Sequence, residues 1–81
     1  MSITVSIKDL EGHILSIRVS GSDTIENGKR KYCTSKNRSF NDYQWKFNAK
    51  VLKNDKTFDF YEIEDGDMIG SNDKSEGGNN Y

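Results

Sequence analysis

The chain carries one helical pattern among several segments that alternate like β-strands, and this arrangement limits the folds it can adopt. Apolar residues recur at every second position in residues 3–7 and 15–19, as expected of strands with one face on a core. The connection between them is short and contains Gly12, so we predict an antiparallel hairpin. Residues 43–47 repeat the alternation with aromatic side chains and give the strongest strand prediction.

The remaining strand signals are shorter. Asn48 and Ala49 predict a turn after the aromatic strand, followed by a short strand over residues 50–53. The aromatic segment 57–61 is too short and too polar for a long element, and we predict one 3₁₀ turn there. A last strand is expected to begin at Met68.

The single helix is predicted from about Ile25 to Lys36. Its inward stripe comprises Ile25, Gly28 and Tyr32, spaced at i, i+3 and i+7. Gly28 is the weak point, because a glycine inside a helix costs about 1 kcal/mol relative to alanine and leaves no side chain in the core. Either neighbouring side chains fill the gap or the domain is only marginally stable.

The order of the predicted elements gives the fold class. It runs strand, strand, helix, strand, short strand, 3₁₀ turn, strand. One helix can bury its apolar stripe only by lying across one face of a sheet. We therefore predict an α+β protein with the β-grasp fold, in which one helix packs across a mixed sheet of four to five strands.

Length and charge limit the partners. The 81 residues suffice for one domain, and the formal net charge of −1 favours neither nucleic acid nor a membrane surface. No apolar run approaches the length of a signal-peptide core or a membrane span. We expect a monomer in the nucleus and cytoplasm.

No group of residues points to catalysis, a metal or a cofactor. Cys33 is the one cysteine, so an internal disulfide cannot form. His13 is the one histidine, and we interpret it as a solvated loop residue. The acidic turn of residues 64–67 lacks the alternating spacing of a calcium loop. We therefore expect that the chain is not an enzyme and binds neither metal nor cofactor.

A basic triplet, residues 29–31, is predicted on the exposed side of the helix. We interpret these three charges as a solvated helix face. The alternative is an unrelated β-grasp scaffold that binds nucleic acid through this triplet with Lys46 and Lys50, which strongly salt-dependent binding would reveal.

The end of the sequence differs in composition from the rest. From Gly70 onward the one apolar residue is Tyr81, and this segment cannot bury enough surface to offset the entropy of ordering it. We predict a domain over residues 1–72 and a flexible tail over residues 73–81. The tail contains Gly77 and Gly78, where the absence of Cβ atoms lets a backbone enter a narrow tunnel.

These segments together resemble a known family. Residues 22–27, followed by Lys29, resemble the helix start of ubiquitin. The Tyr32-Cys33 pair and residues 64–69 are similar to the small ubiquitin-like modifiers, the SUMO proteins. Both patterns extend without a gap from Ile3 to Gly78, and in both families a diglycine closes the mature protein. The chain thus resembles a ubiquitin-like modifier closest to SUMO.

The resemblance implies a mechanism in which this chain is the substrate. A processing protease would cut after Gly78, before Asn79, and an activating enzyme would adenylate the freed carboxylate and take it onto a cysteine as a thioester. A conjugating enzyme would then pass Gly78 to a lysine amine of a target protein, forming an isopeptide bond. Gly77, Gly78 and Asn79 are the conjugation and processing residues that it implies.

The resemblance also implies non-covalent recognition. SUMO proteins bind extended peptides by strand addition in the groove between the second strand and the helix. The matching positions here are Ile17, Arg18, Val19, Ser20, Asn27 and Gly28. Because lysines common in the family are replaced by Ser20 and Asn27, we expect weaker binding or less acidic partners.

Two further features stay open. Lys50 matches a chain-forming lysine of ubiquitin, and Lys53 lies in a segment similar to a SUMO acceptor motif, so both are possible acceptor lysines. The chain could also be a ubiquitin-like binding module that is never conjugated, with Gly77 and Gly78 as a relic.

Overall fold

Two strands at the start of the chain form the predicted hairpin. The computed structural model describes residues 2–34, 36 and 39–73, and in it β1 (Ser2–Lys8) pairs antiparallel with β2 (Ile14–Ser20). The loop between them uses Gly12, whose φ of 92° lies in the left-handed region that glycine adopts without strain. Val5 and Ile7 of β1 face the core together with Ile17 and Val19 of β2, which confirms the alternation read from the sequence.

The helix α1 (Ile25–Thr34) begins where the sequence predicts and ends earlier. Thr24 Oγ1 accepts the backbone N–H of Asn27, which satisfies one of the donors left without a partner at the helix start. The prediction that the helix continues to about Lys36 was wrong. The N–H of Lys36 donates to the Cys33 carbonyl, three residues earlier. This hydrogen bond forms a tight turn and does not continue the α-helical pattern.

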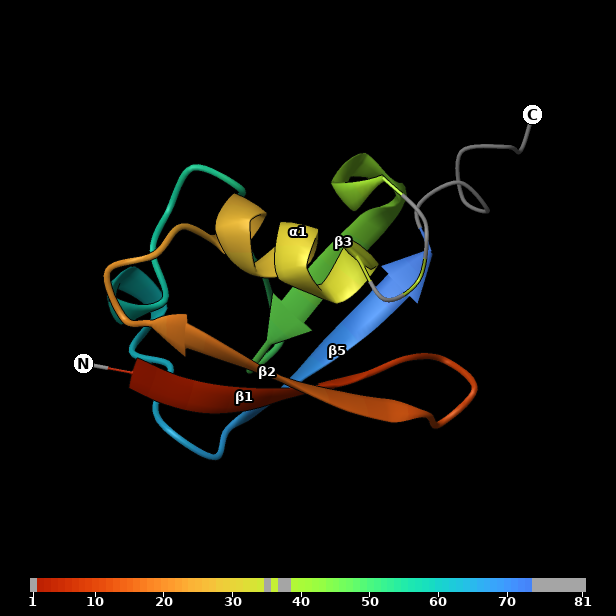
Figure 1. The fold of residues 1–81 in the computed structure, drawn as a ribbon, viewed down its shortest axis with the longest axis horizontal. Helices are drawn as coiled ribbons and strands as arrows, with labels where there is room; N and C mark the ends of the chain where they lie inside the picture. The colour runs from red at the N-terminus through yellow and green to blue at the C-terminus, as the bar shows by residue number, and fades with distance from the viewer. Residues whose placement is uncertain (1, 35, 37–38, 74–81) are drawn as a thin grey trace.

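The sheet places the first and last strands side by side. It contains β3 (Tyr43–Phe47), β4 (Lys50–Val51) and β5 (Met68–Asp73) in the order β2-β1-β5-β3-β4. The β1–β5 pair is parallel and the other pairs are antiparallel. Helix α1 lies across one face of this sheet (Figure 1). The α+β fold class and the mixed β-grasp sheet are confirmed.

Two short 3₁₀ helices complete the described structure. The first, η1 (Phe40–Asp42), is capped by Ser39, whose hydroxyl accepts the N–H of Asn41, and it leads directly into β3. The second, η2 (Asp59–Tyr61), confirms the predicted 3₁₀ turn. The Tyr61 hydroxyl accepts the N–H of Lys53, and this hydrogen bond connects η2 to the segment after β4.

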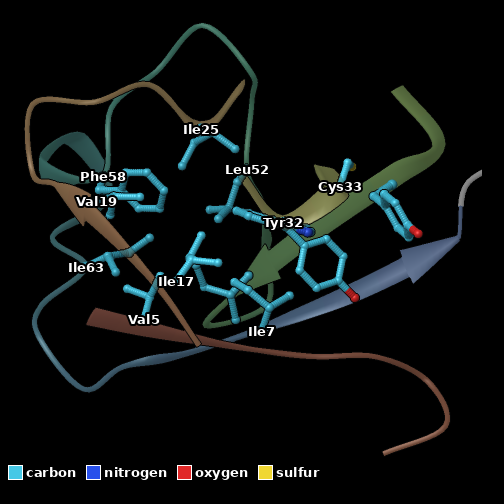
Figure 2. Packing of buried hydrophobic residues seen from close by; sticks show 13 residues of the cluster. Val5, Ile7, Ile17, Val19, Ile25, Tyr32, Cys33, Leu52, Phe58 and Ile63 are labelled. Atoms are coloured by element: carbon cyan, nitrogen blue, oxygen red, sulfur yellow. The ribbon is translucent and has the colours of Figure 1, made fainter. Parts of the chain in front are cut away.

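The core fills the gap that Gly28 leaves in the helix stripe. Side chains from α1, β1 and β2 point toward one another between helix and sheet (Figure 2). A Cβ built on Gly28 would lie 2.6 Å from Cζ of Phe58 and 3.3 Å from Cζ3 of Trp45. Both rings are fully buried, so the space next to Gly28 is occupied by aromatic side chains from outside the helix.

The acidic turn before β5 connects that strand to β1. Asp65 Oδ1 accepts the N–H of Thr4, and the Thr4 carbonyl accepts the N–H of Gly66. Asp67 Oδ2 accepts the N–H of Glu64 within the turn. These carboxylates therefore satisfy backbone donors where the parallel pair begins.

The basic triplet is not the exposed face that the sequence predicted. Lys29 is 4% exposed, and its Nζ donates to Asn54 Oδ1 at 2.7 Å. Arg30 forms an ion pair with Glu26 at 2.8 Å, and its guanidinium lies 4.6 Å from the centroid of the Phe40 ring. The prediction was wrong for Lys29 because the Asn54 loop covers that side of the helix.

The described part of the chain ends with β5 at Asp73. The predicted boundary between a domain over residues 1–72 and a tail over residues 73–81 falls at this strand end, and residues 74–81 lie outside the described structure. Among the described helices, none combines the length and the apolar character that a membrane crossing requires.

Candidate functional site

The strand β2 lies at one end of the sheet and pairs on one side only, with β1. Such an edge presents backbone N–H and C=O groups to a further strand. Which groups face outward follows from β1. The backbone N–H groups of Thr4 and Ser6 donate to the turn before β5, so the backbone groups of these two residues point away from β2. Their partners in the register, Arg18 and Ser16, therefore direct their own backbone groups to the open edge.

Part of this edge is already occupied within the molecule. The N–H of Ser20 donates to Asp23 Oδ2, and the Ser20 carbonyl accepts the N–H of Asp23. Lys31 reaches from α1, and its Nζ donates to the Arg18 carbonyl at 2.7 Å. Within the described residues, the N–H of Arg18 and both backbone groups of Ser16 have no such partner. An added strand could therefore form hydrogen bonds with the backbone groups of Ser16 and with the N–H of Arg18.

The six residues implied for the groove lie on the neighbouring elements β2 and α1, with different exposures. Ile17, Val19 and Gly28 are buried and form part of the core beneath the edge. Arg18 has an exposed side chain, and Ser20 and Asn27 are half-buried. The side chains of Ile17 and Val19 therefore offer little surface to a partner, while the backbone of β2 remains accessible.

Two contributors to this edge were missed from the sequence. Ser16 supplies open backbone groups, but its position gives no signal until the register with β1 is known. Lys31 was interpreted as part of a solvated triplet, whereas it bonds to the Arg18 carbonyl of β2. Its long flexible side chain could have suggested this contact only if the distance between α1 and β2 had been known.

The residues implied for conjugation are only partly within the described structure. Gly77, Gly78 and Asn79 lie outside the described residues. The possible acceptor lysines, Lys50 and Lys53, are both exposed, one in β4 and one just after it. Both amines are therefore sterically accessible to another protein.

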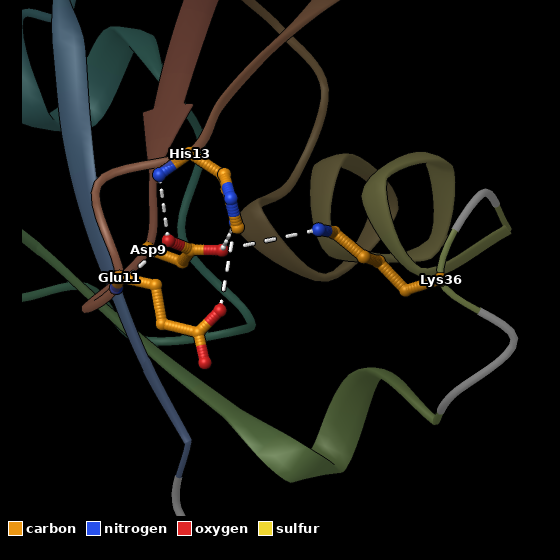
Figure 3. A network of polar contacts seen from close by, with 4 residues as sticks. All are labelled: Asp9, Glu11, His13 and Lys36. Carbon is orange, nitrogen blue, oxygen red and sulfur yellow. Dashed lines mark hydrogen bonds and ion pairs between the residues drawn. The ribbon is translucent and has the colours of Figure 1, made fainter.

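The β1–β2 loop gathers potential metal ligands. Asp9 Oδ2 and Glu11 Oε1 each lie 3.5 Å from Nδ1 of His13, and Lys36 Nζ is 4.0 Å from Asp9 Oδ2 (Figure 3). Asp9 Oδ1 accepts the N–H groups of both Glu11 and His13 at 2.9 Å. The bond from His13 is the main cause that holds the pKa of the Asp9 carboxyl below its ordinary value of 3.8. These contacts close the turn, and the neighbouring lysine opposes a cation there.

Comparison with known proteins agrees with this geometry. A family model described as "Ubiquitin-2 like Rad60 SUMO-like" matches residues 3–70. The match begins in β1 and ends within β5, so it spans the helix and all the sheet strands but stops before Gly77. No curated protein matches the chain.

Proposed function

The chain belongs to the Rad60-SLD family of SUMO-like, ubiquitin-like domains, and on this premise we propose that it is a protein modifier attached to target lysines through Gly78. The observation that supports conjugation is the spacing at the end of the chain. Gly77 and Gly78 follow the last residue of β5, Asp73, after only three intervening residues. Because glycine has no Cβ, the backbone of this diglycine can enter an enzyme channel that is too narrow for side chains.

The proposed reaction sequence needs three kinds of enzyme. A protease hydrolyses the bond after Gly78. An activating enzyme attaches the new carboxylate to the adenylyl group of ATP, which releases pyrophosphate, and its own cysteine thiol then displaces AMP to form a thioester. A conjugating enzyme takes over the thioester, and a lysine amine of the target displaces the thiol to form the amide. The chain supplies its carboxylate and its recognition surface. Domains of this family are generally not enzymes themselves.

The second candidate function is non-covalent recognition of extended peptides. It is favoured by the open edge of β2, where Ser16 and the N–H of Arg18 are available for strand addition. This function needs no diglycine, so it also suits a domain that is never conjugated. In both cases we propose protein partners, a monomeric state, and residence in the nucleus and cytoplasm.

Conjugation is tested in cells that naturally express the gene, by blotting for the full chain and measuring its mass. We expect a ladder of larger conjugates and a mature form that ends at Gly78. Gly78→Ala should abolish the ladder, whereas the matched control Asn80→Ala, which lies beyond the cleavage point, should retain it. An unprocessed chain without conjugates would refute the modifier function.

Strand addition is tested separately in solution with a capped, uncharged peptide rich in valine and threonine. We expect the amide resonances of Ser16 and Arg18 to shift on titration. N-methylation of the peptide removes individual donors, and it should abolish binding only at the positions that face β2. Equal tolerance of methylation at every position would contradict strand addition. Gly78→Ala should leave this binding unchanged, which separates the two functions.

A further inference from the structure

A small pocket opens between α1 and the segment that connects β4 to η2. It has a volume of about 240 Å³, and its described lining comes from α1, β3, β4 and the residues just after β4. Sites for drug-sized ligands measure about 300–1,000 Å³, so this pocket suits a group of side-chain size. Because β3 and β4 form the end of the sheet opposite to β2, a ligand here would not compete with a peptide on β2.

The lining of this pocket is cationic. Lys29 and Lys53 each contribute an amine, and Gln44 and Asn54 each contribute a carboxamide. Among the described residues that line the pocket, none carries a carboxylate. The pocket therefore combines positive charge with N–H donors, which is the combination that anions prefer.

The amine of Lys29 is held in place before any ligand arrives. Lys29 is 4% exposed, and its Nζ donates to Asn54 Oδ1 at 2.7 Å. The Asn54 carbonyl in turn accepts the backbone N–H of Glu26, at 3.1 Å, which ties this segment to the start of α1. The acceptor of the Lys29 contact is a neutral amide, so the contact orders the ammonium group without adding a negative charge. An anion would therefore bind to groups that are already ordered.

The acidic residues nearest in sequence do not reverse this charge. The Glu26 carboxylate forms an ion pair with the Arg30 guanidinium at 2.8 Å, so its charge is compensated on the helix surface. Asp55 follows Asn54 directly but is exposed and does not line the pocket. The pocket is thus locally positive on a chain whose formal net charge is −1.

The mouth of the pocket also offers apolar surface. Val51 lines it and is 45% exposed, and the exposed Lys53 lies two residues further along the chain. Burial of the Val51 side chain would stabilise a ligand that has carbon atoms next to its anionic group, whereas a free inorganic ion gains nothing from it. This surface favours an anion carried on a side chain.

We propose that this pocket binds the phosphoryl group of a phosphorylated side chain in a partner protein. A phosphoryl group carries a charge of about −1.5 to −2 at pH 7 and has three strong acceptor oxygens. The amines of Lys29 and Lys53 supply opposite charge, and the carboxamide N–H groups supply further donors. A carboxylate brings less charge and fewer oxygens, and it fits this lining less well.

The test uses the full chain labelled with ¹⁵N and a short capped peptide that contains one phosphoserine followed by leucine. We expect the amides of Gln44, Lys53 and Asn54 to shift, and those of Ser16 and Arg18 to stay in place. The same peptide without the phosphoryl group should not shift the amides of the pocket. A peptide with glutamate in place of phosphoserine should bind at least about fivefold more weakly.

Two variants test the pocket itself. Asn54→Asp keeps an acceptor oxygen for Lys29 but places a negative charge in the lining, and it should weaken binding more than about tenfold. Lys53→Met removes the exposed amine and should weaken binding about fivefold. The matched control is Lys46→Met, because Lys46 is an exposed lysine of β3 that does not line the pocket. This control should bind like the original chain.

Several results would overturn the proposal. Unchanged affinity in Asn54→Asp would exclude the pocket, and an equal loss in Lys46→Met would indicate general surface charge. Equal binding of inorganic phosphate would mean that the site takes a free ion, and equal shifts with a single-stranded oligonucleotide would indicate nucleic acid. Absence of shifts up to the solubility limit of the phosphopeptide would also contradict it. The spectrum of each variant reports whether the fold is intact. Conjugation through Gly78 plays no part in this assay, so its outcome is independent of the modifier function.

Discussion

Phe58 occupies the space that a side chain at Gly28 would need. The Cζ atom of Phe58 lies 2.6 Å from the position of a Cβ on Gly28, closer than real Cβ contacts allow. The glycine in the middle of α1 is therefore required by a ring that comes from the segment before η2. The side chains allowed at position 28 therefore depend on the residue at position 58, and the reverse also holds.

Substitution at Gly28 should therefore destabilise the fold in spite of its better helix propensity. Gly28→Ala gains about 1 kcal/mol of propensity but forces the buried Phe58 ring to move, and overpacking of a core costs typically about 1–3 kcal/mol. We expect a net loss of about 1 kcal/mol in the free energy of unfolding, measured by chemical denaturation. The control Asn27→Ala, one position away and half-buried, should not show this loss.

A double-mutant cycle checks the cause of that loss. Phe58→Leu removes ring atoms, so Gly28→Ala should cost less in the Phe58→Leu background than in the original chain. Additive effects would show that the two positions are not coupled.

The turn between β3 and β4 offers a stabilising substitution. Asn48 and Ala49 both have positive φ, the geometry of a type I′ hairpin turn, for which glycine is preferred at the second position. Ala49→Gly removes left-handed strain but adds freedom to the unfolded chain, and we expect a net gain of about 0.5–1 kcal/mol in the free energy of unfolding. Asn48→Gly is the comparison and should gain less, because asparagine tolerates this conformation. Destabilisation by Ala49→Gly would contradict the turn geometry.

The β1–β2 loop should make stability depend on acidic pH. Because hydrogen bonds from His13 and Glu11 lower the pKa of Asp9 in the folded state, its ionised form contributes stability above the ordinary pKa of 3.8. That contribution is lost as the pH falls through the lowered value. We expect Asp9→Asn to be less stable than the original chain at neutral pH and to lose less stability on acidification, measured by denaturation at a series of pH values.

The ion pair with Lys36 provides the control for Asp9. Lys36→Met removes the 4.0 Å contact and leaves the two backbone hydrogen bonds intact. This variant should keep most of the acid dependence, since the charge of Lys36 is the smallest of the causes that lower the Asp9 pKa. If Lys36→Met behaved like Asp9→Asn, the ion pair and not the backbone bonds would govern the titration.

Lys31 should compete with peptides that add to β2. Its Nζ bonds to the outward carbonyl of Arg18, which an added strand would need as an acceptor. Lys31→Met releases that carbonyl, and a hydrogen bond of this kind is worth roughly 0.5–1 kcal/mol, so an uncharged peptide should bind about two- to fivefold more tightly. Titration calorimetry measures the change. The control is Lys53→Met, because Lys53 follows β4, the strand at the opposite edge of the sheet from β2. Unchanged affinity in Lys31→Met would mean that peptides do not use the Arg18 carbonyl.

The sequence by itself determined the elements and their arrangement. Strand alternation and helix periodicity are local properties, so β1, β2 and β3, the start of α1 and the η2 turn were all predicted from neighbouring residues. One helix with a single apolar stripe then left few ways to cover a sheet, and the β-grasp fold followed. The candidate edge at β2 was predicted through the resemblance to SUMO. The diglycine, Gly77 and Gly78, is visible in the sequence of the chain itself.

Only the tertiary structure decided which side chains meet. Lys29 can be buried because its Nζ donates a hydrogen bond to Asn54 Oδ1, twenty-five residues away in sequence, and Gly28 is tolerated because the Phe58 ring fills the space beside it. The backbone groups of β2 that are open to an added strand depend on the register with β1. Such contacts join residues distant in sequence, and no local pattern specifies them, because a side chain's partner is fixed only when the whole sheet is assembled.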